Sequence, residues 1–329
     1  SFTFNEPLEY FKNYKYVVES SLSKSELDFE TAMKLDPIFI KPKNKDLFSP
    51  IFIKDFNLKK QVKRARLYIT GLGLYRAFIN DKKVGNAFLT PGYNDYDYYL
   101  RYQTYDITEL LNEENHIEVH MGDGWYKGRM GFDNNGKTNI YGDEYKLCLY
   151  MYIELIDYDI VIIIGDETWQ VKSSKQIKNN IYDGEEVDYT LPESSLEEVE
   201  IAQEKYNLIP DYGALIVEKD ILHPELYISP KGEQILDFKQ NMVGFVRYKG
   251  ILEKNQEMKM SHGEVLQEEC FYNLNYRTSK SLLKYKGDGE KRIYEPKFTF
   301  FGFRYVLVEG IEKVDPNDFE GVVIYTNLV

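Results

Sequence analysis

The sequence predicts an all-β protein with two jelly-roll-like β-sandwiches in tandem behind a short N-terminal arm. Short segments in which polar and apolar residues alternate recur along most of its 329 residues. Clusters of Gly, Asp, Asn and Pro separate these segments, as turns between strands require. Tyrosine is abundant, with 29 residues, and aromatic residues favour strands.

Residues 33–222 are expected to form the first and larger sandwich. Its clearest strand patterns are, in order, Val62–Thr70, Leu74–Asn80, His116–Met121, Tyr145–Leu155 and Ile160–Ile164. We expect a bend at Gly71–Gly73 and a turn at Asp81–Lys82 on either side of the second of these strands.

Residues 1–32 are expected to form the N-terminal arm. Within it, Tyr10–Ala32 is interpreted as one or two short helices, with Ser23 or Ser25 as an N-cap. The short acidic segment Leu196–Gln203 is a further helix candidate. Neither segment carries a chemical motif.

Pro210–Pro224 has the composition of a junction, and residues 223–329 are expected to form the second sandwich. Strand patterns resume after the junction at Gln234–Phe238, Gly244–Lys249, Glu257–His262, Ser281–Tyr285 and Tyr305–Glu309.

The net charge of −13 argues against nucleic acid as a partner, because an acidic chain repels phosphate backbones. The longest apolar run, Ile160–Ile164, is too short to span a membrane. No signal peptide is visible at the start, so we expect a cytoplasmic, soluble protein. Cys148 and Cys270 fit no metal or redox spacing and are expected to be reduced core thiols.

Histidines 116 and 120 are four residues apart, a spacing that binds metal on a helix. Ile117, Val119 and Met121 instead indicate a strand, on which the two histidines would lie about 13 Å apart. The sequence shows no nucleophile triad and no phosphate-binding loop. Several carboxyl groups lie near turns, but no spacing selects a catalytic pair among them.

Three loop segments combine carboxylate and amide oxygens with aromatic rings: Pro91–Tyr99, Gly122–Gly131 and Asp133–Glu144. Hard oxygen ligands suit calcium, and an aromatic face suits the C–H surface of a sugar ring. The alternative interpretation is that Trp125 and Tyr126 only pin a loop onto the sandwich.

Ordered motifs in the first half of the chain resemble those of one enzyme family. They are Ala65–Gly85 (ARLYITGLGLYRAFINDKKVG), Leu89–Tyr96 (LTPGYNDY), Tyr102–Leu111 (YQTYDITELL), Gly122–Gly128 (GDGWYKG) and Asp183–Asp188 (DGEEVD). Asp81 stands where the family has Gly, Tyr93 where it has Trp, and Val187 where it has Tyr.

Three motifs of the second half continue the same order: Ile235–Val246 (ILDFKQNMVGFV), His262–Leu266 (HGEVL) and Pro296–Tyr305 (PKFTFFGFRY). Together the motifs resemble the N-terminal part of bacterial α-L-rhamnosidases, glycoside hydrolase family 78. The resemblance runs from about residue 45 to the end. Lys239 and Phe301 depart from the family's Gly and His.

The resemblance implies a jelly-roll sandwich followed by a concanavalin-like sandwich, which in the family precede a catalytic (α/α)6 barrel. It implies rhamnose-containing glycosides and that barrel as partners, and it carries over no catalytic residue. The first sandwich also resembles, loosely, jelly-roll rhamnose-binding modules that use calcium. We therefore predict a carbohydrate-binding or purely scaffolding role, with Asp95, Tyr96, Asp123, Trp125 and Tyr126 as candidate sugar-binding residues and calcium as a candidate cofactor.

Overall fold

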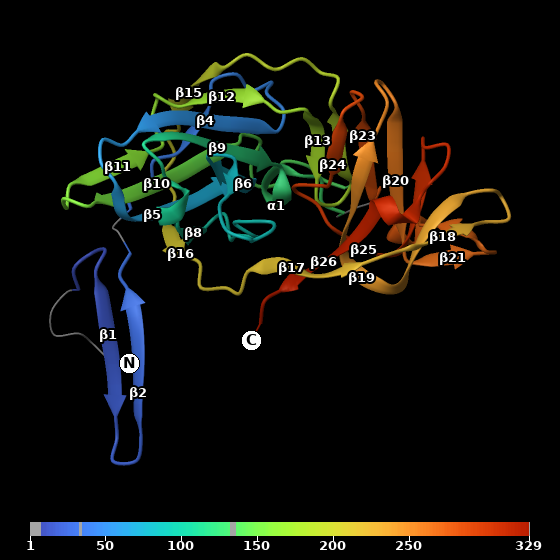
Figure 1. Ribbon diagram of the computed structural model, residues 1–329. Coiled ribbons are helices and arrows are strands. Elements are labelled where there is room, and N and C mark those ends of the chain that lie inside the picture. Colours follow the sequence, from blue (N-terminus) through green and yellow to red (C-terminus); the bar gives the residue numbers. More distant parts are fainter. Residues whose placement is uncertain (1–7, 33–34, 132–135, 329) are drawn as a thin grey trace. The chain divides into compact units, whose positions relative to one another are not determined.

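The computed structural model describes residues 8–32, 35–131 and 136–328. Strands dominate these residues, which confirms the predicted all-β class, and α1 (Gly124–Lys127) is the one α-helix among them. The chain divides into two compact units, residues 1–37 and 38–329, and the second contains both sandwiches (Figure 1). Short 3-10 turns occur at η1 (Thr108–Leu110), η2 (Leu274–Tyr276) and η3 (Pro316–Asp318).

The N-terminal unit is a hairpin of β1 (Asn13–Glu19) and β2 (Lys24–Glu30), which pair in antiparallel fashion. The helices expected within Tyr10–Ala32 are therefore wrong. The period-2 pattern explains the difference, because alternate residues of a strand share one face. Tyr14 lies opposite Phe29 in the hairpin, and their rings stack with centroids 5.8 Å apart.

The first sandwich contains most strands between residues 40 and 210. They are β3 (Ile40–Pro42), β4 (Pro50–Asn57), β5 (Val62–Leu72), β6 (Leu74–Ile79), β7 (Lys82–Lys83), β8 (Leu100–Asp106), β9 (Glu114–Gly122), β10 (Lys146–Leu155), β11 (Ile160–Ile164), β12 (Gln170–Ser173), β15 (Glu197–Ile201) and β16 (Leu208–Pro210). All five strands predicted for this region are confirmed.

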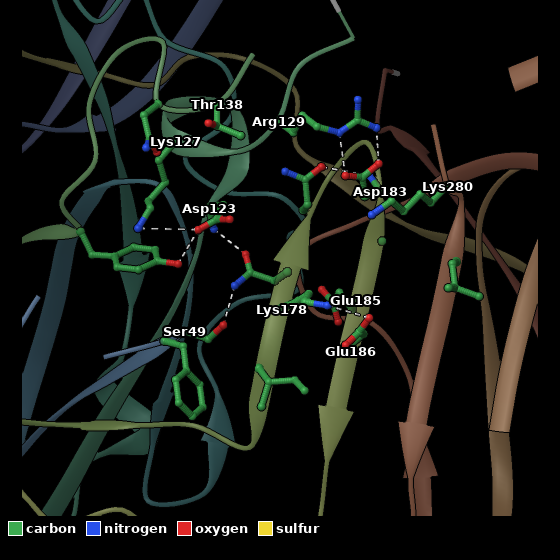
Figure 2. Close-up of a pocket in the computed structure, with 18 of the residues that line it drawn as sticks. Ser49, Asp123, Lys127, Arg129, Thr138, Lys178, Asp183, Glu185, Glu186 and Lys280 are labelled. Carbon is green, nitrogen blue, oxygen red and sulfur yellow. Dashed lines mark hydrogen bonds and ion pairs between the residues drawn. The ribbon is translucent and has the colours of Figure 1, made fainter. Parts of the chain in front are cut away.

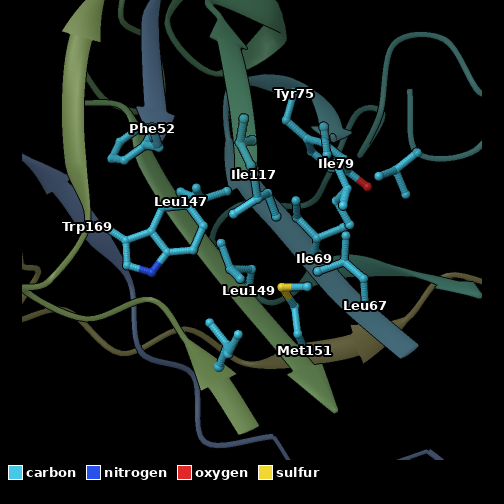
Figure 3. Packing of buried hydrophobic residues seen from close by; sticks show 14 of the residues in the cluster. Phe52, Leu67, Ile69, Tyr75, Ile79, Ile117, Leu147, Leu149, Met151 and Trp169 are labelled. Atoms are coloured by element: carbon cyan, nitrogen blue, oxygen red, sulfur yellow. The ribbon is translucent and has the colours of Figure 1, made fainter. Parts of the chain in front are cut away.

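These strands form one continuous sheet in the order β16-β8-β5-β10-β3-β15-β12-β4-β9-β6-β7, with β11 beside β10. Figure 1 shows the β4, β9 and β12 part of the sheet lying over the β5, β8 and β10 part. The apolar core fills the space between these two layers. Trp169 and Phe52 are fully buried there and pack with Leu147 of the opposite layer (Figure 3).

The segment expected as a helix at Leu196–Gln203 is instead strand β15, so that expectation is wrong. β15 pairs with β3 on one side and with β12 on the other, and thereby closes the sheet. Val199 is its buried residue, and the exposed Glu198 pairs with Lys43 at 2.6 Å. Cross-strand ion pairs of this kind stabilise a strand whose composition alone favours a helix.

Strands β6 and β7 are joined by a two-residue turn at Asn80–Asp81, one residue earlier than expected. Both residues have positive φ, 50° and 63°, the geometry of a hairpin turn that favours Gly at its second position.

We predict that Asp81→Gly stabilises the protein by up to about 1 kcal/mol because it removes left-handed strain. Urea unfolding measures this effect. The exposed Lys82→Gly change, which lies within β7, is expected to destabilise.

The second sandwich is built from the remaining strands. They are β13 (Gln176–Asn180), β14 (Gly184–Asp188), β17 (Ile216–Leu222), β18 (Glu225–Ile228), β19 (Gln234–Ile251), β20 (Glu257–Gly263), β21 (Val265–Gln267), β22 (Cys270–Tyr272), β23 (Leu282–Lys286), β24 (Lys291–Tyr294), β25 (Phe301–Glu309) and β26 (Phe319–Thr326). The ten-stranded main sheet runs β13-β14-β23-β20-β25-β19-β26-β17, with β18 and β24 beside β19.

Two predicted strands of this half, Gln234–Phe238 and Gly244–Lys249, are parts of the single long strand β19. The register of β19 against β25 shifts between Asp237 and Met242, so the strand bends there. Its first part pairs with β18 and its last part with β24. The bend lets one strand run along two sides of the second core.

The sandwiches exchange strands across the predicted junction. β13 and β14 precede the junction in sequence, yet β14 pairs in parallel with β23 of the second sheet, and Figure 1 shows β13 among the strands of that sandwich. The chain itself passes between the sheets just after β16, which pairs with β8, and before β17, which pairs with β26. The limits 33–222 and 223–329 remain predictions.

A shared apolar cluster joins the two sandwiches. Leu74 and Leu89 of the first sandwich pack with Phe245, Phe298 and Val322 of the second, all at most 4% exposed. Because these side chains form one buried cluster, separating the sandwiches would expose several large apolar surfaces to water.

Candidate functional site

The short helix α1 carries candidate residues on two sides. It follows directly after β9, and Gly124 at its start has a φ of +57°. Trp125 and Tyr126 contact a group of aromatic rings, whereas Asp123 and Lys127 line a polar cleft. The motif GDGWYKG thus contributes to two different surfaces of the first sandwich.

The first surface is an aromatic cluster formed by Tyr93, Tyr96, Trp125, Tyr126 and Tyr141. Tyr96 lies at its centre, with ring centroids 4.8 Å from Tyr141, 5.2 Å from Tyr126 and 6.0 Å from Tyr93. Tyr93 also meets the edge of Trp125 at 6.3 Å. The hydroxyls of Tyr93 and Tyr141 form a hydrogen bond of 2.5 Å. Residues from three loop segments therefore converge here.

Burial differs strongly within the aromatic cluster. Tyr126 is only 5% exposed, whereas Tyr93 is 49% exposed and faces solvent. Trp125 packs against the apolar cluster that joins the two sandwiches. Burial raises the pKa values of Tyr96 and Tyr126, and the hydrogen bond between the Tyr141 and Tyr93 hydroxyls raises the pKa of Tyr141 to about 12. The hydroxyls of Tyr96, Tyr126 and Tyr141 are therefore neutral at physiological pH.

The second surface is a polar cleft of about 520 Å³. One wall comes from α1 and its flanks, with Asp123, Lys127 and Arg129, and the other from β13, β14 and the start of β23. Figure 2 shows Lys127 and Asp123 on one side, with Lys178, Glu186 and Lys280 on the other. We call the antiparallel pair of β13 and β14, which precedes the junction but joins the second sheet, the exchanged hairpin. The polar cleft lies where this hairpin meets the first sandwich.

Hydrogen bonds fix both walls of the polar cleft. The Arg129 guanidinium binds both carboxylate oxygens of Asp183, with Nε to Oδ2 at 2.7 Å. Asp123 accepts a 2.5 Å hydrogen bond from the Tyr145 hydroxyl, and its backbone N–H donates to Asn179 at 2.5 Å. The bidentate pair of Arg129 and Asp183 holds both side chains in one orientation.

Asp123 and Lys127 form a loose ion pair, with 3.9 Å between Nζ and Oδ1. Desolvation raises the pKa of Asp123, although the Tyr145 hydrogen bond opposes this shift. Desolvation likewise lowers the pKa of Lys127, against the attraction of Asp123. The Lys127 ammonium lies 3.9 Å from the centroid of the Tyr145 ring, which holds it over an aromatic face.

The structure brings together three of the five candidate residues, namely Tyr96, Trp125 and Tyr126. Asp123 lies in the polar cleft instead. Asp95 is exposed, and its backbone carbonyl accepts the N–H groups of Tyr98 and Tyr99, as in a turn. The sugar-binding role of all five stays a prediction.

In the described part of the chain, no three His, Cys, Asp or Glu side chains gather as metal ligands would. Of the oxygen-rich segment Asp133–Glu144, considered for calcium, the first three residues lie outside the described residues. His116 and His120 lie on strand β9, as predicted, and each contacts Glu118, at 3.3 and 3.2 Å. Cys148 and Cys270 are buried free thiols, as expected.

Sequence reasoning did not single out Tyr141, Arg129 or Asp183. Tyr93 and Tyr141 stand in loop segments that attracted attention, but only the fold shows that their hydroxyls meet. The pair of Arg129 and Asp183 joins residues 54 positions apart. No spacing in the sequence signals this pair, because it depends on where the exchanged hairpin docks.

Glu185, beside the polar cleft, is a buried carboxylate, with 1% exposure. It accepts the backbone N–H groups of Lys297, at 3.0 and 2.9 Å to its two oxygens, and of Phe298, at 2.5 Å. Burial raises its pKa to about 7, against the opposing effect of these two N–H donors. Glu185 therefore ties strand β14 to the loop that carries Phe298.

The fold and these surfaces define a tandem β-sandwich protein with an aromatic cluster on its first sandwich and a polar cleft lined by both sandwiches. A family model described as the α-L-rhamnosidase N-terminal domain matches residues 60–214. A model of the bacterial α-L-rhamnosidase concanavalin-like domain matches residues 228–325. The chain belongs to the α-L-rhamnosidase family and corresponds to the N-terminal, all-β portion of its members.

Curated relatives agree with this assignment. α-L-Rhamnosidases of Streptomyces avermitilis and Formosa agariphila are each 31% identical to this chain, over 286 and 293 residues. The matches cover 82% and 83% of this chain but only 27% and 31% of those proteins. The chain therefore spans less than a third of the length of either relative.

Two solved structures confirm the fold. The α-L-rhamnosidase of Aspergillus terreus superposes with a TM-score of 0.89 at 29% identity, over 98% of this chain and 41% of that one. The α-L-rhamnosidase of Dictyoglumus thermophilum gives 0.84 at 28%, over 97% and 40%. Within the described residues, no helix is long and apolar enough to cross a membrane.

Proposed function

We propose that this chain is the sugar-binding N-terminal portion of a longer α-L-rhamnosidase, and that the aromatic cluster holds a terminal rhamnose residue. The observation that supports this most strongly is the convergence of five aromatic rings from three loops, with Tyr93 left 49% exposed at the surface. An exposed ring with a fixed hydroxyl offers both an apolar face and a hydrogen bond, which a sugar ring needs.

The partner in this proposal is a catalytic (α/α)6 barrel that hydrolyses terminal α-L-rhamnosides. The length of the curated relatives supports it, since this chain spans less than a third of each. A shallow aromatic site binds weakly, in the micromolar to millimolar range, which corresponds to roughly 4 to 8 kcal/mol. Such affinity suits a site that keeps an enzyme near its glycan.

Tyr93→Ala tests the proposal better than a change at Trp125, because Trp125 also packs in the apolar cluster between the sandwiches. We expect Tyr93→Ala to weaken rhamnoside binding about tenfold, since one contact with an aromatic ring contributes about 0.5–1.5 kcal/mol. Isothermal titration with L-rhamnose and a methyl rhamnoside measures the affinity, with calcium and with a chelator.

Two variants serve as controls. Tyr93→Phe keeps the ring but loses the hydroxyl, and it is expected to lose only part of the affinity that Tyr93→Ala loses. Tyr98→Ala removes a neighbouring tyrosine that is 75% exposed and lies outside the aromatic cluster. If the parent chain takes up no sugar in any condition, the sandwiches serve as a scaffold only. Cleavage of a rhamnoside by this chain alone would contradict the non-catalytic interpretation.

A further inference from the structure

We propose that the polar cleft is a second carbohydrate site, separate from the aromatic cluster, and that it takes a neutral pyranose residue. Its volume of about 520 Å³ lies within the usual range of small-ligand sites. None of the five residues of the aromatic cluster lines it. The two sites share only the backbone of α1, so each can be altered alone.

Two ion pairs already engage four of the charged side chains that line the polar cleft, and this favours a neutral ligand. Arg129 binds Asp183, and Lys178 binds Glu186 at 3.1 Å. A charged ligand would have to compete with one member of such a pair, in a chain whose net charge of −13 also repels anions. A neutral ligand meets neither cost.

Sugar hydroxyls match what the paired groups still offer. A carboxylate has about four lone-pair directions, so the Glu186 carboxylate, which binds Lys178 through one oxygen, has further acceptor directions to offer. A hydroxyl donates and accepts at once, and can bridge a carboxylate and a cation. Exposed Thr138 and Asn139 add a hydroxyl and an amide at the rim of the same cleft.

The polar cleft also has an apolar part. Phe48 and Ile177 line it and remain 39% and 36% exposed. Phe48 precedes β4 of the first sandwich, and Ile177 lies in β13 of the second sheet. Next to them, the Ser49 hydroxyl accepts a hydrogen bond of 2.5 Å from the Asn179 side chain. An apolar surface beside fixed polar groups is the combination that binds one C–H face and the hydroxyls of a pyranose.

Lys127 is the donor best prepared for such a ligand. Its ammonium is held over the Tyr145 ring and only loosely paired with Asp123, at 3.9 Å. Its side chain is 20% exposed, so its N–H groups are ordered before a ligand arrives. A donor fixed in advance loses less conformational entropy on binding than a flexible surface lysine does.

The test uses saturation-transfer NMR with methyl α-D-galactopyranoside, methyl α-D-glucopyranoside and D-galacturonate as probes. We expect a signal from at least one neutral pyranoside that survives in Tyr93→Ala. In Lys127→Met and in Phe48→Ala the signal should fall at least fivefold. Lys82→Met, an exposed lysine on β7, is the matched control and should leave it unchanged.

Each other outcome contradicts a definite part of the proposal. If Tyr93→Ala loses the signal while Lys127→Met and Phe48→Ala keep it, the aromatic cluster alone binds sugar. A stronger, salt-sensitive signal from galacturonate means that the ligand is acidic. No signal from any probe in the parent chain rejects the second site, whatever the rhamnoside titration shows. Thermal unfolding of each variant verifies that it is folded.

Discussion

Replacing Glu185 by alanine is expected to lower the free energy of unfolding by about 3 kcal/mol. Two backbone N–H groups, those of Lys297 and Phe298, would lose their acceptor inside the protein, and each buried donor without a partner costs roughly 1–3 kcal/mol. Phe298 also packs against Gly122, where an added Cβ would overlap its ring. Urea unfolding of the parent chain and the variant measures the loss.

Glu185→Gln is the control, because its side-chain oxygen can still accept both N–H groups. The Gln variant should retain most of the stability that the Ala variant loses. If the two variants prove equally unstable, the carboxylate charge rather than its acceptor role would be what the fold requires.

The raised pKa of Glu185 predicts that the free energy of unfolding depends on pH, and the Gln variant serves as the reference. The pKa of Glu185 is about 7 in the folded chain and near 4.5 as its ordinary value. Between these values the folded chain keeps a proton that the unfolded chain has released, so this stabilisation is complete below pH 4.5 and lost as pH rises through 7. The stability of the parent relative to Glu185→Gln should therefore fall over that range. A flat difference would show that Glu185 titrates normally.

Gly184→Ala is expected to be at least as damaging as the loss of Glu185, with a cost of about 3 kcal/mol or more. Gly184 has a φ of +108°, which strains any residue with a Cβ. An added Cβ would also overlap the backbone carbonyl of Leu282 in the neighbouring strand β23. Backbone cannot give way as a flexible side chain can, so β14 would have to leave the sheet.

Gly92→Ala separates these two causes. Gly92 also has a positive φ, +85°, but an added Cβ there has no neighbour within 4 Å. This change should cost only the conformational strain, roughly 1–2 kcal/mol. Soluble yield and urea midpoints of the two variants measure the difference. Equal losses would mean that the overlap with Leu282 is relieved by a small shift.

Most of the fold could be predicted from local patterns. Segments such as His116–Met121 alternate so regularly that only a strand fits them, and the structure has strand β9 there. The failures lie where composition and packing disagree. Residues 196–203 are rich in glutamate, which favours a helix, yet the gap between β3 and β12 requires a strand. The N-terminal hairpin was missed because its period-2 pattern extends over only a few residues in each strand.

The candidate site was predictable only in part, for a similar physical reason. Trp125, Tyr126 and Tyr96 could be chosen because aromatic residues in loops are unusual, and their rings do meet. Asp123 was chosen with them, but its side chain lines the polar cleft, whereas Trp125 and Tyr126 contact the aromatic cluster. The polar cleft depends on β13 and β14 joining the second sheet, and no property of residues 176–188 indicates which sheet they enter.

That strand exchange also affects the order in which a nascent chain can fold. β14 leaves the ribosome roughly 100 residues before β23, the strand beside which it finally lies. At about 5–20 residues per second, the interval is on the order of 5–20 s. During this time the hairpin has β13 as a neighbour but an open edge on its other side, and open edges invite pairing with other chains. Slow translation through this stretch would therefore favour aggregation, and a chaperone that shields residues 176–188 would favour the native sheet.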